Sequence, residues 1–519
     1  MKKSNVISLI LSAALVLSLF VFAVPSSAKW DGQSVAVSLG GTGDEATPFL
    51  IRTEAELAKL AQSVNEGTTY EGQFIRLEAD LDLDGKDWTP IGTLSTAYFA
   101  GTFDGGEHTI TGLAVNTTVD YAGLFGVVKD GTVKNLNVEA VSVYGIKYAG
   151  VIAGHMMVTA GTGKTVISNC HVISAGSVVG TTMGGLVGRA STTGATAEQM
   201  IITGCSVKNA KLSSHEETDD KVPAGNAKNA FIGGIIGAAG AITVQNSFTD
   251  GIEITGGGAK ATAYATLGGI VGVQGASNAT CNIHNCYCVN SKITVLAGTV
   301  AGEKTYSGGI VGRSGHSVDD SEIKNCFAIA NVLENKTVED NVGSICGGVI
   351  NWINVANLSS DSEKAIGYDQ GSQDYPSQTF TSNDFAAADA VEKLGLNNGN
   401  SKTVWLSSPV DGHPVIDIDA SADNVCSAEA WDPYTNITLP ETSAADTSES
   451  APDESAPAES EQDTVPETDP EPTQPAQTAV TTTPVTEPAK TKKGCGSAVS
   501  LIAPALILGF AVINAKKRK

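Results

Sequence analysis

Three cysteines and one histidine fall close together in the second half of the chain, namely Cys281, His284, Cys286 and Cys288. Thiolates and imidazoles are the ligands that zinc prefers, and a structural site uses four of them at short spacings. No second Cys or His pair follows at such a spacing, and strand alternation would send Cys286 and Cys288 to one side and Tyr287 to the other. We therefore predict no metal centre here.

A second candidate is the run Asp80, Asp82, Asp84 and Gly85, which imitates the start of a calcium-binding loop. The twelfth position of such a loop should be a bidentate Glu, but here it is Ile91. Leucines alternate with the aspartates, which indicates a strand with one solvent-exposed face. The residues alone leave a weaker, nonstandard calcium site open.

Two shorter motifs also fail as functional sites. Residues 161–165 resemble a phosphate-binding loop, but the required earlier Gly is Val158 and no strand-to-helix context follows. His215 and Glu216 begin like a zinc-protease helix, but Asp219 stands where the second His should be. The histidines are scattered, so no Ser, His and acid set can be assembled, and we predict no catalytic residues and no cofactor.

The elements that would position such side chains come from an internal repeat with two motifs. The first is Gly, two apolar residues and a small residue, and the second is apolar-x-Asn-small. The first motif begins at Gly123, Gly150, Gly185, Gly234, Gly269, Gly309 and Gly348, with Ala153 and Asn351 in place of the closing Gly in two units. The second begins at Val133, Ile167, Ile202, Val244, Ile283 and Ile323.

Repeated motifs separated by segments of varying length are typical of stacked scaffolds with outward loops. Each unit offers only short β-branched runs, which bury their apolar face when equivalent strands stack about 4.8 Å apart. The predicted fold is therefore all-β, a parallel β-helix. Gly at the fixed places suits positive φ or close backbone approach, and Asn suits left-handed corners.

Four of the nine cysteines share one slot of the repeat: Cys170, Cys205, Cys286 and Cys326. Ser247 and Leu136 fill the same slot in other units, so the slot needs only a small or apolar inward side chain. We expect a ladder of buried thiols rather than disulfides.

The Gly-Gly-Ile/Leu-Val-Gly runs followed by Ile-x-Asn-Cys resemble the GLUG repeat, which occurs beside bacterial IgA-protease domains and in bacterial surface proteins. The resemblance covers residues 121–357. The preceding segment resembles the leader of such repeats, through Gly43–Ile51, Trp88–Gly92 and Gly101–Ile110. The resemblance implies a scaffold and carries over no catalytic residues.

Two segments should close the stack. In the leader and cap, 29–120, Thr53 and Glu56 form a capping box, and Leu57, Leu60, Ala61 and Val64 make the apolar stripe of a short helix over the open end. In the C-terminal cap, 358–425, a helix is expected at 386–394, with Trp405, Pro414 and Ile416 covering the other end.

The ends of the chain predict its location. Residues 1–28 are a secretory signal peptide, 426–493 a disordered acidic Pro/Ser/Thr-rich linker, and 494–519 a transmembrane anchor with a basic cytoplasmic tail. Cys495 beside the anchor has no predicted role. We expect a single-pass type I protein on the surface of a Gram-positive bacterium.

The predicted function is non-catalytic binding or adhesion to extracellular glycans or proteins. The loops of variable length, above all 213–229 and 256–266, are the expected binding elements. A polysaccharide-cleaving β-helix is the alternative enzyme, and Arg189 and Arg313 could share its active face although Ala238 and Val273 stand between them. A passive spacer is a third possibility. The net charge of −24 argues against nucleic acid as a partner.

Overall fold

The computed structural model describes residues 29–417 except 216–228, 258–263, 277–278, 298–303, 315–320, 351–353, 363, 370–376 and 399. The predicted signal peptide, linker and anchor, Cys495 and residues 418–425 of the predicted cap lie outside the described residues. Within the described ranges, no helix is long and apolar enough to cross a membrane. The chain divides at Ser450 into two units, and all described residues belong to the first.

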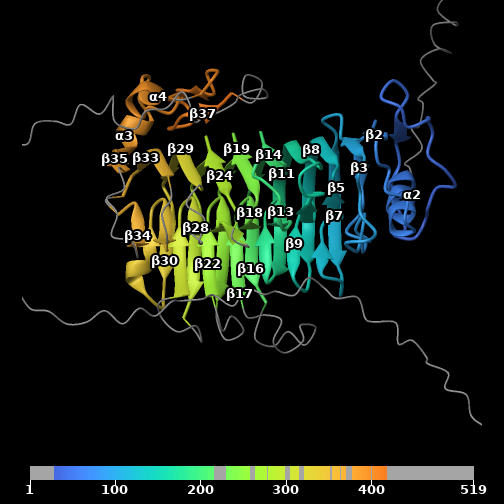
Figure 1. The fold of residues 1–519 in the computed structure, drawn as a ribbon, viewed down its shortest axis with the longest axis horizontal. Helices are drawn as coiled ribbons and strands as arrows, with labels where there is room; N and C mark the ends of the chain where they lie inside the picture. Colours follow the sequence, from blue (N-terminus) through green and yellow to red (C-terminus); the bar gives the residue numbers. More distant parts are fainter. Residues whose placement is uncertain are drawn as a thin grey trace, which may run out of the picture. The chain divides into compact units, whose positions relative to one another are not determined.

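Successive coils of this unit pair through parallel strands, which confirms the β-helix-like, all-β fold (Figure 1). One complete coil shows the path of the chain, and its five strands are β17 (Asn229–Gly233), β18 (Ile236–Ala239), β19 (Ile242–Gln245), β20 (Phe248–Asp250) and β21 (Glu253–Gly257). Each strand pairs in register with its equivalent in the next coil, as Ile236 does with Val271 and Val244 with Ile283.

Three parallel sheets run along the stack. The seven-stranded sheet contains β17 with β6 (Tyr121–Ala122), β9 (Tyr148–Gly150), β12 (Thr182–Gly184), β22 (Tyr264–Gly268), β27 (Thr305–Gly308) and β31 (Val342–Gly343). The eight-stranded sheet contains β18 with β7 (Phe125–Lys129), β10 (Ala153–Met157), β13 (Val187–Ala190), β23 (Val271–Gln274), β28 (Val311–Ser314), β32 (Cys346–Val349) and β34 (Ile366–Asp369).

The twenty-stranded sheet contains β19, β20 and β21 together with the remaining parallel strands. These are β1 (Phe49–Ile51), β2 (Phe74–Leu77), β3 (Leu81–Asp82), β4 (Thr102–Asp104), β5 (Thr109–Asn116), β8 (Thr132–Tyr144), β11 (Thr165–Gly180), β14 (Met200–Thr203), β15 (Ser206–Lys208), β16 (Ala210–Ser214), β24 (Cys281–His284), β25 (Tyr287–Val289), β26 (Lys292–Leu296), β29 (Glu322–Ile329), β30 (Val332–Asn335), β33 (Asn354–Ser360) and β35 (Ser377–Thr379). A short 3-10 helix, η3 (Glu339–Asn341), precedes β31.

The register corrects the frame of two predicted repeat units. Gly150 pairs with Gly184, so the second unit is Val151–Gly154 and its closing residue is Gly154, not Ala153. Cys346 pairs with Val311, so the seventh unit is Ser344–Gly347 instead of the predicted motif at Gly348. The closing glycine is thus kept in both units.

Close packing explains why this closing position is glycine. A Cβ on Gly272 would lie 2.7 Å from the backbone nitrogen of Ile232, in the seven-stranded sheet of the preceding coil. Gly312 has the same relation to Leu267, and Gly347 to Ser307. These glycines do not adopt positive φ, so of the two predicted reasons close backbone approach is the one that applies.

The repeated Asn of the second motif forms a left-handed corner, as predicted. Its φ lies between 49° and 53° at Asn135, Asn169, Asn246, Asn285 and Asn325, and Gly204 occupies the same corner at 65°. Neighbouring amides are linked along the stack, with Asn285 Nδ2 donating to Asn246 Oδ1 at 3.0 Å. The Asn side chains at the corner therefore hydrogen-bond to one another along the stack.

The thiol slot next to each corner is buried, and none of the described cysteines forms a disulfide. Each slot thiol donates to the carbonyl two residues earlier, for example Cys205 to Thr203 at 3.3 Å. Ser247 makes the same bond to Gln245 at 2.7 Å, which explains how it substitutes for cysteine. Burial raises the pKa of the Cys170 and Cys326 thiols well above its usual range, so these groups stay protonated.

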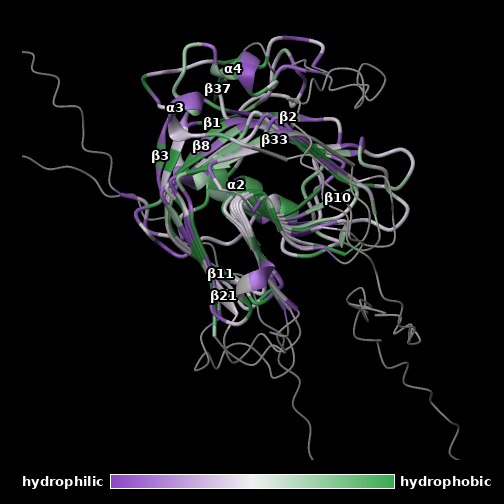
Figure 2. Cartoon of the chain, turned by 90° about the vertical axis from the view of Figure 1, so that its left-hand side faces the viewer, coloured by the Kyte–Doolittle hydropathy of each residue, from purple (hydrophilic) through white to green (hydrophobic). Residues whose placement is uncertain are grey.

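The N-terminal end is closed by helix α2 (Glu54–Asn65), as predicted. Thr53 and Glu56 form the capping box, and the apolar stripe Leu57, Leu60, Ala61 and Val64 is buried. These residues belong to the same core cluster as the coils. Seen along the stack, α2 lies within the outline of the coils (Figure 2).

The C-terminal segment, 382–416, does not lie where the sequence predicted. Instead of one helix at 386–394 it forms α3 (Ser382–Phe385) and α4 (Ala390–Lys393), followed by the antiparallel pair β36 (Trp405–Leu406) and β37 (Val415–Ile416). It packs along the side of the stack above β24 and β29 (Figure 1).

An aromatic ladder on the outer face of three coils holds this segment. Phe248 and Tyr287 stack at 4.6 Å between ring centroids, and Tyr287 and Phe327 at 5.0 Å. Trp405 packs 5.4 Å from Phe327 and donates to Asn285 Oδ1 at 3.2 Å. Because these rings point away from the core, covering them removes apolar surface from water.

Candidate binding surface

The two loops predicted to bind ligand begin and end along one edge of the stack. The first joins β16 to β17 and the second joins β21 to β22, and these strands are register neighbours. A third interval, between β26 and β27, lies in the same row. Residues 216–228, 258–263 and 298–303 of these intervals lie outside the described residues, and the strands that flank them are register neighbours.

Beside this edge, the outer faces of the seven-stranded and eight-stranded sheets turn toward each other. We call this junction the seam. Its seven-stranded wall carries Tyr121, Tyr148, Phe231, Tyr264, Thr266 and Tyr306, and its eight-stranded wall carries His155, Arg189, Ala238, Val273, Arg313 and Gly348. At one position a glycine makes room for an aromatic ring of the other wall, because a Cβ on Gly348 would lie against the ring of Tyr306.

Arg189 is fully engaged within the seam. Its Nη1 donates to the Tyr148 hydroxyl at 3.0 Å and its Nε donates to Ser191 Oγ at 3.1 Å. The guanidinium carbon also lies 5.3 Å from the centre of the Tyr148 ring, which is a cation–π distance. Arg189 therefore holds the two walls together.

His155 lies beside Arg189 and is 6% exposed. Its ring stacks on Tyr121 at 5.5 Å, and its Nε2 lies 3.1 Å from Ser191 Oγ. Burial, assisted by the positive charge of Arg189, lowers the pKa of His155 to about 3. An imidazole with such a pKa is a weak base, and its Nδ1 has no hydrogen-bond partner, so this His-Ser pair lacks the acid that orients a catalytic triad.

Arg313 shares a column with Arg189, as the sequence suggested. Register pairing runs from Arg189 to Ala238, then to Val273 and then to Arg313. Three strand spacings of about 4.8 Å separate the two arginines, or roughly 14 Å. Each contacts a different tyrosine, because the Arg313 guanidinium lies 5.1 Å from the ring of Tyr264. They share a face but do not converge on one substrate position.

The cysteine and histidine cluster proposed and rejected from sequence is divided by the strand. Cys286 and Cys288 point into the core, whereas Tyr287 packs under the C-terminal segment. His284 Nε2 lies 2.9 Å from Glu322, whose other oxygen accepts from Lys324 at 2.7 Å. Burial raises the Glu322 pKa, but the hydrogen bonds from His284 and Lys324 outweigh it and the net pKa is lowered.

The aspartates of the calcium-like run turn to different partners. Asp80 accepts from the backbone of Thr109, and Asp84 pairs with Lys29 and Lys86. Asp82 Oδ1 accepts from the backbone nitrogen of Asp84 at 2.9 Å. Across the described part of the chain, no group of three or more His, Cys, Asp or Glu side chains is arranged to hold a metal ion.

The other two sequence motifs also have structural explanations. The phosphate-loop imitation is the turn between β10 and β11, where Gln199 Nε2 donates to the carbonyl of Gly163 at 2.8 Å. A strand, not a helix, begins at Thr165. His215 is buried, with Nε2 3.2 Å from the carbonyl of Ile146. Glu216 and Asp219 of the second motif lie outside the described residues.

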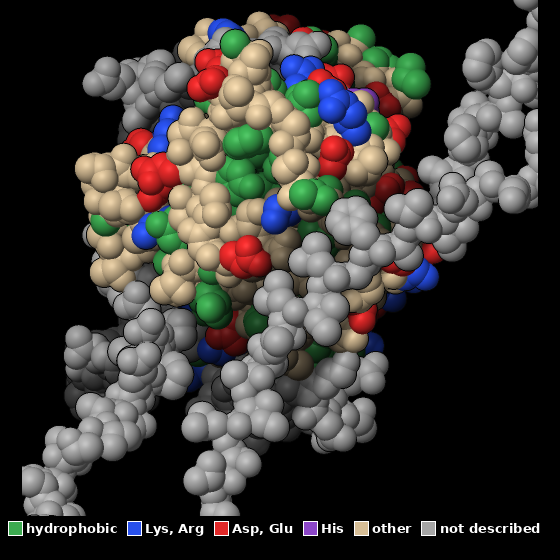
Figure 3. Space-filling model, turned by 90° about the vertical axis from the view of Figure 1, so that its right-hand side faces the viewer, with side chains coloured by type: hydrophobic (Ala, Val, Ile, Leu, Met, Phe, Trp, Pro, Cys, Tyr) green, Lys and Arg blue, Asp and Glu red, His purple; other side chains and the backbone are tan. Residues whose placement is uncertain are grey.

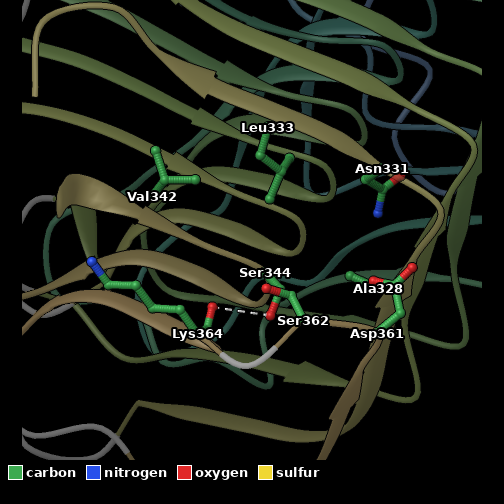
Figure 4. A pocket seen from close by; sticks show the side chains of 8 residues that line it. All are labelled: Ala328, Asn331, Leu333, Val342, Ser344, Asp361, Ser362 and Lys364. Carbon is green, nitrogen blue, oxygen red and sulfur yellow. Dashed lines mark hydrogen bonds between the residues drawn. The ribbon is translucent and has the colours of Figure 1, made fainter. Parts of the chain in front are cut away.

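Two hollows lie near the ends of the stack. One, of 330 Å³, is lined near the last coil by residues that include Leu333, Ser344 and Lys364 (Figure 4). There Ser344 Oγ already donates to the carbonyl of Lys364 at 3.2 Å. The other, of 680 Å³, involves leader residues that include Arg76 and His108. Figure 3 shows the N-terminal end, with charged side chains around a hydrophobic centre.

Comparison with known proteins gives partial matches. No family model matches the chain. The "Putative Gly-rich membrane protein" of Evansella cellulosilytica is 39% identical over 105 residues, which are 20% of this chain and 12% of that protein. "Halomucin" of Haloquadratum walsbyi is 29% identical over 143 residues, 25% of this chain and 2% of that protein. The chain thus spans a small part of the length of these curated relatives.

Among solved structures, a "putative immunoglobulin A1 protease from Bacteroides ovatus" aligns with a TM-score of 0.43 and 20% identity. The alignment covers 73% of this chain and 94% of that one.

Proposed function

We propose that this chain is a non-catalytic, surface-displayed β-solenoid of the GLUG-repeat type that binds an extracellular glycan or protein. The observation that carries the proposal is that three intervals of different length interrupt the same edge of the strand stack in successive coils. Three successive coils keep their strands in register while the intervals between those strands differ, running from Ser214 to Asn229, Gly257 to Tyr264 and Leu296 to Thr305. Rigid scaffolds with variable loops are how solenoids present binding surfaces.

Display at the cell surface is inferred from the sequence at the two ends of the chain. A signal peptide at 1–28, an extended acidic linker at 426–493 and an anchor at 494–519 would hold the solenoid outside a single membrane. The first curated relative is named a membrane protein, which is consistent with this location. Twelve acidic residues and no basic residue between Glu441 and Glu487 favour an extended linker through self-repulsion.

The enzyme alternative has less support. A polysaccharide lyase or hydrolase needs an acid and a base close to one bond. Within the described seam, His155 is a weak base, Arg189 is engaged with Tyr148 and Ser191, and Arg313 lies about three strands away. These groups suit recognition better than proton transfer.

The test uses the soluble ectodomain, 29–493, on arrays of glycans and extracellular matrix proteins. We expect one ligand class to be retained and left chemically unchanged, with no new reducing ends or unsaturated products. Replacing residues 216–228 by a Gly/Ser linker of equal length should reduce retention. The same replacement at 160–164, on a different edge, serves as the matched control.

Other outcomes would contradict the proposal. Product formation that survives repurification would favour the enzyme. Retention of no ligand would favour the passive spacer, provided that the ectodomain melts cooperatively. Unchanged retention after replacing 216–228 would show that binding lies elsewhere on the solenoid.

A further inference from the structure

Arg313 is a buried cation that is 6% exposed. Its Nε is fully buried and unpaired, and its recorded contact is with the ring of Tyr264 at 5.1 Å. Burying a charge without hydrogen bonds is costly, so such a side chain is expected to have an acceptor in the functional state.

Arg189 occupies the equivalent position three coils earlier and shows which partners Arg313 lacks. Arg189 donates to the Tyr148 hydroxyl and to Ser191 Oγ. Register places Thr266 in the column of Tyr148, and the sequence has Gly315 where the Arg189 unit has Ser191. Thr266 is shorter than Tyr148 and glycine has no side chain, so neither residue type provides the side-chain acceptor that Arg189 uses. The Nε that donates to Ser191 in Arg189 is unpaired in Arg313.

Two further groups beside Arg313 favour an anion. Lys304 Nζ lies 5.3 Å from the centre of the same Tyr264 ring, so two cations flank one aromatic ring. Thr266, on the same face of β22 as Tyr264, is fully buried and its Oγ1 has no hydrogen-bond partner. Two cations therefore lie against the Tyr264 ring, and an unpaired hydroxyl lies two residues further along the same strand.

We propose that Arg313, Lys304 and Thr266 form a binding site for a single carboxylate group of a saccharide ligand. The inference deepens the proposed binding function and rests on it. The planar guanidinium fork matches a carboxylate in bidentate geometry, and charge-assisted bonds of this kind are the strong ones. Because the whole chain carries a net charge of −24, a ligand with one carboxylate is favoured over a polyanion.

The test measures thermal melting and calorimetric binding of the purified full-length chain with sodium glucuronate as the probe. Glucose and equimolar sodium chloride are the controls for the sugar ring and for ionic strength. We expect glucuronate to raise the melting temperature while glucose and chloride do not, because ligands that bind the folded state stabilise it. Sodium acetate, which carries the carboxylate without the sugar, should bind more weakly than glucuronate.

Arg313→Met and Arg189→Met form a matched pair of variants. Without ligand, Arg313→Met should melt at or above the parent temperature, because it removes an unpaired buried charge. It should also lose about tenfold or more in glucuronate affinity. Arg189→Met should melt lower, since it removes the hydrogen bonds from Arg189 to Tyr148 and Ser191, and should keep its affinity. Lys304→Ala should weaken binding without lowering the melting temperature.

The site would be disproved if glucuronate gave no more stabilisation than sodium chloride, or if Arg313→Met bound it as the parent does. A fall in melting temperature of Arg313→Met equal to that of Arg189→Met would also overturn the inference. Retention of a neutral ligand on the array with no glucuronate binding would leave the proposed function standing and defeat this site. If glucuronate bound but no glycan or matrix protein on the arrays were retained, the site would stand and the proposed function would fail.

Discussion

Replacing Ile235 by Asp is expected to destabilise the solenoid by about 4 kcal/mol or more. Ile235 lies in the tight turn between β17 and β18 and is 0% exposed. Its backbone nitrogen donates to the carbonyl of Ile270 in the next coil at 2.9 Å, so its position is fixed by the stack. A carboxylate there would be buried without a partner. Thermal melting of the purified variant measures the effect.

Ile173→Asp is the matched control, because Ile173 lies on the outer face of β11 and is 38% exposed. It should melt within a few degrees of the parent, since exposed substitutions change stability little. Equal melting temperatures for Ile235→Asp and the parent would show that Ile235 does not face the core.

Replacing Gly272 by Ala should cost about 3 kcal/mol, at the upper end of what overpacking usually causes. The added methyl group would lie 2.5 Å from the carbonyl oxygen of Gly237 and 2.7 Å from the nitrogen of Ile232. Both are backbone atoms held by the sheets, so relief requires the two walls of the seam to separate. We expect a lower melting temperature and, because the seam opens, weaker ligand retention.

Gly40→Ala provides the comparison for this substitution. A Cβ at Gly40 would have no atom within 4 Å, and its backbone does not need positive φ. It should behave as the parent in both assays. Similar behaviour of Gly272→Ala and Gly40→Ala would refute the close-approach explanation of the repeated glycine.

The left-handed corners and the buried thiol positions were predictable from the sequence, because the same residue type recurs wherever the fold needs the same conformation or the same small inward side chain. Asn285 and its equivalents mark left-handed φ, and Cys286 and its equivalents mark an inward position beside it. It was harder to predict from the sequence which residue begins each glycine motif. Gly150–Ala153 and Val151–Gly154 both fit a pattern of small and apolar residues, and pairing of Gly150 with Gly184 decides between them.

The position of the C-terminal segment was missed, although a signal for it exists. An aromatic residue follows the Asn corner by two positions in three consecutive units, at Phe248, Tyr287 and Phe327. Alternation places these rings outside, where three stacked aromatics need a cover. Trp405 and Phe385 supply it, and the expectation that the segment covers the end of the stack overlooked this outer ladder.

The seam could be predicted only in part. The sequence placed Arg189 and Arg313 in one column, but not the tyrosines that they meet. Arg189 contacts Tyr148 and Arg313 contacts Tyr264, each in the preceding coil and at different separations along the chain. Such contacts depend on the tilt of one wall against the other, which periodicity does not encode.

Photo-cross-linking tests the central claim most directly, since it asks where the ligand lies on the solenoid. The full-length chain would be irradiated with a photoreactive derivative of the ligand retained on the arrays, and the modified peptides identified by mass spectrometry. We predict that cross-links fall in the seam strands β17, β22, β27 and β28 and in the segments that precede β17, β22 and β27. Cross-links confined to the leader strands or to the C-terminal segment would contradict the account.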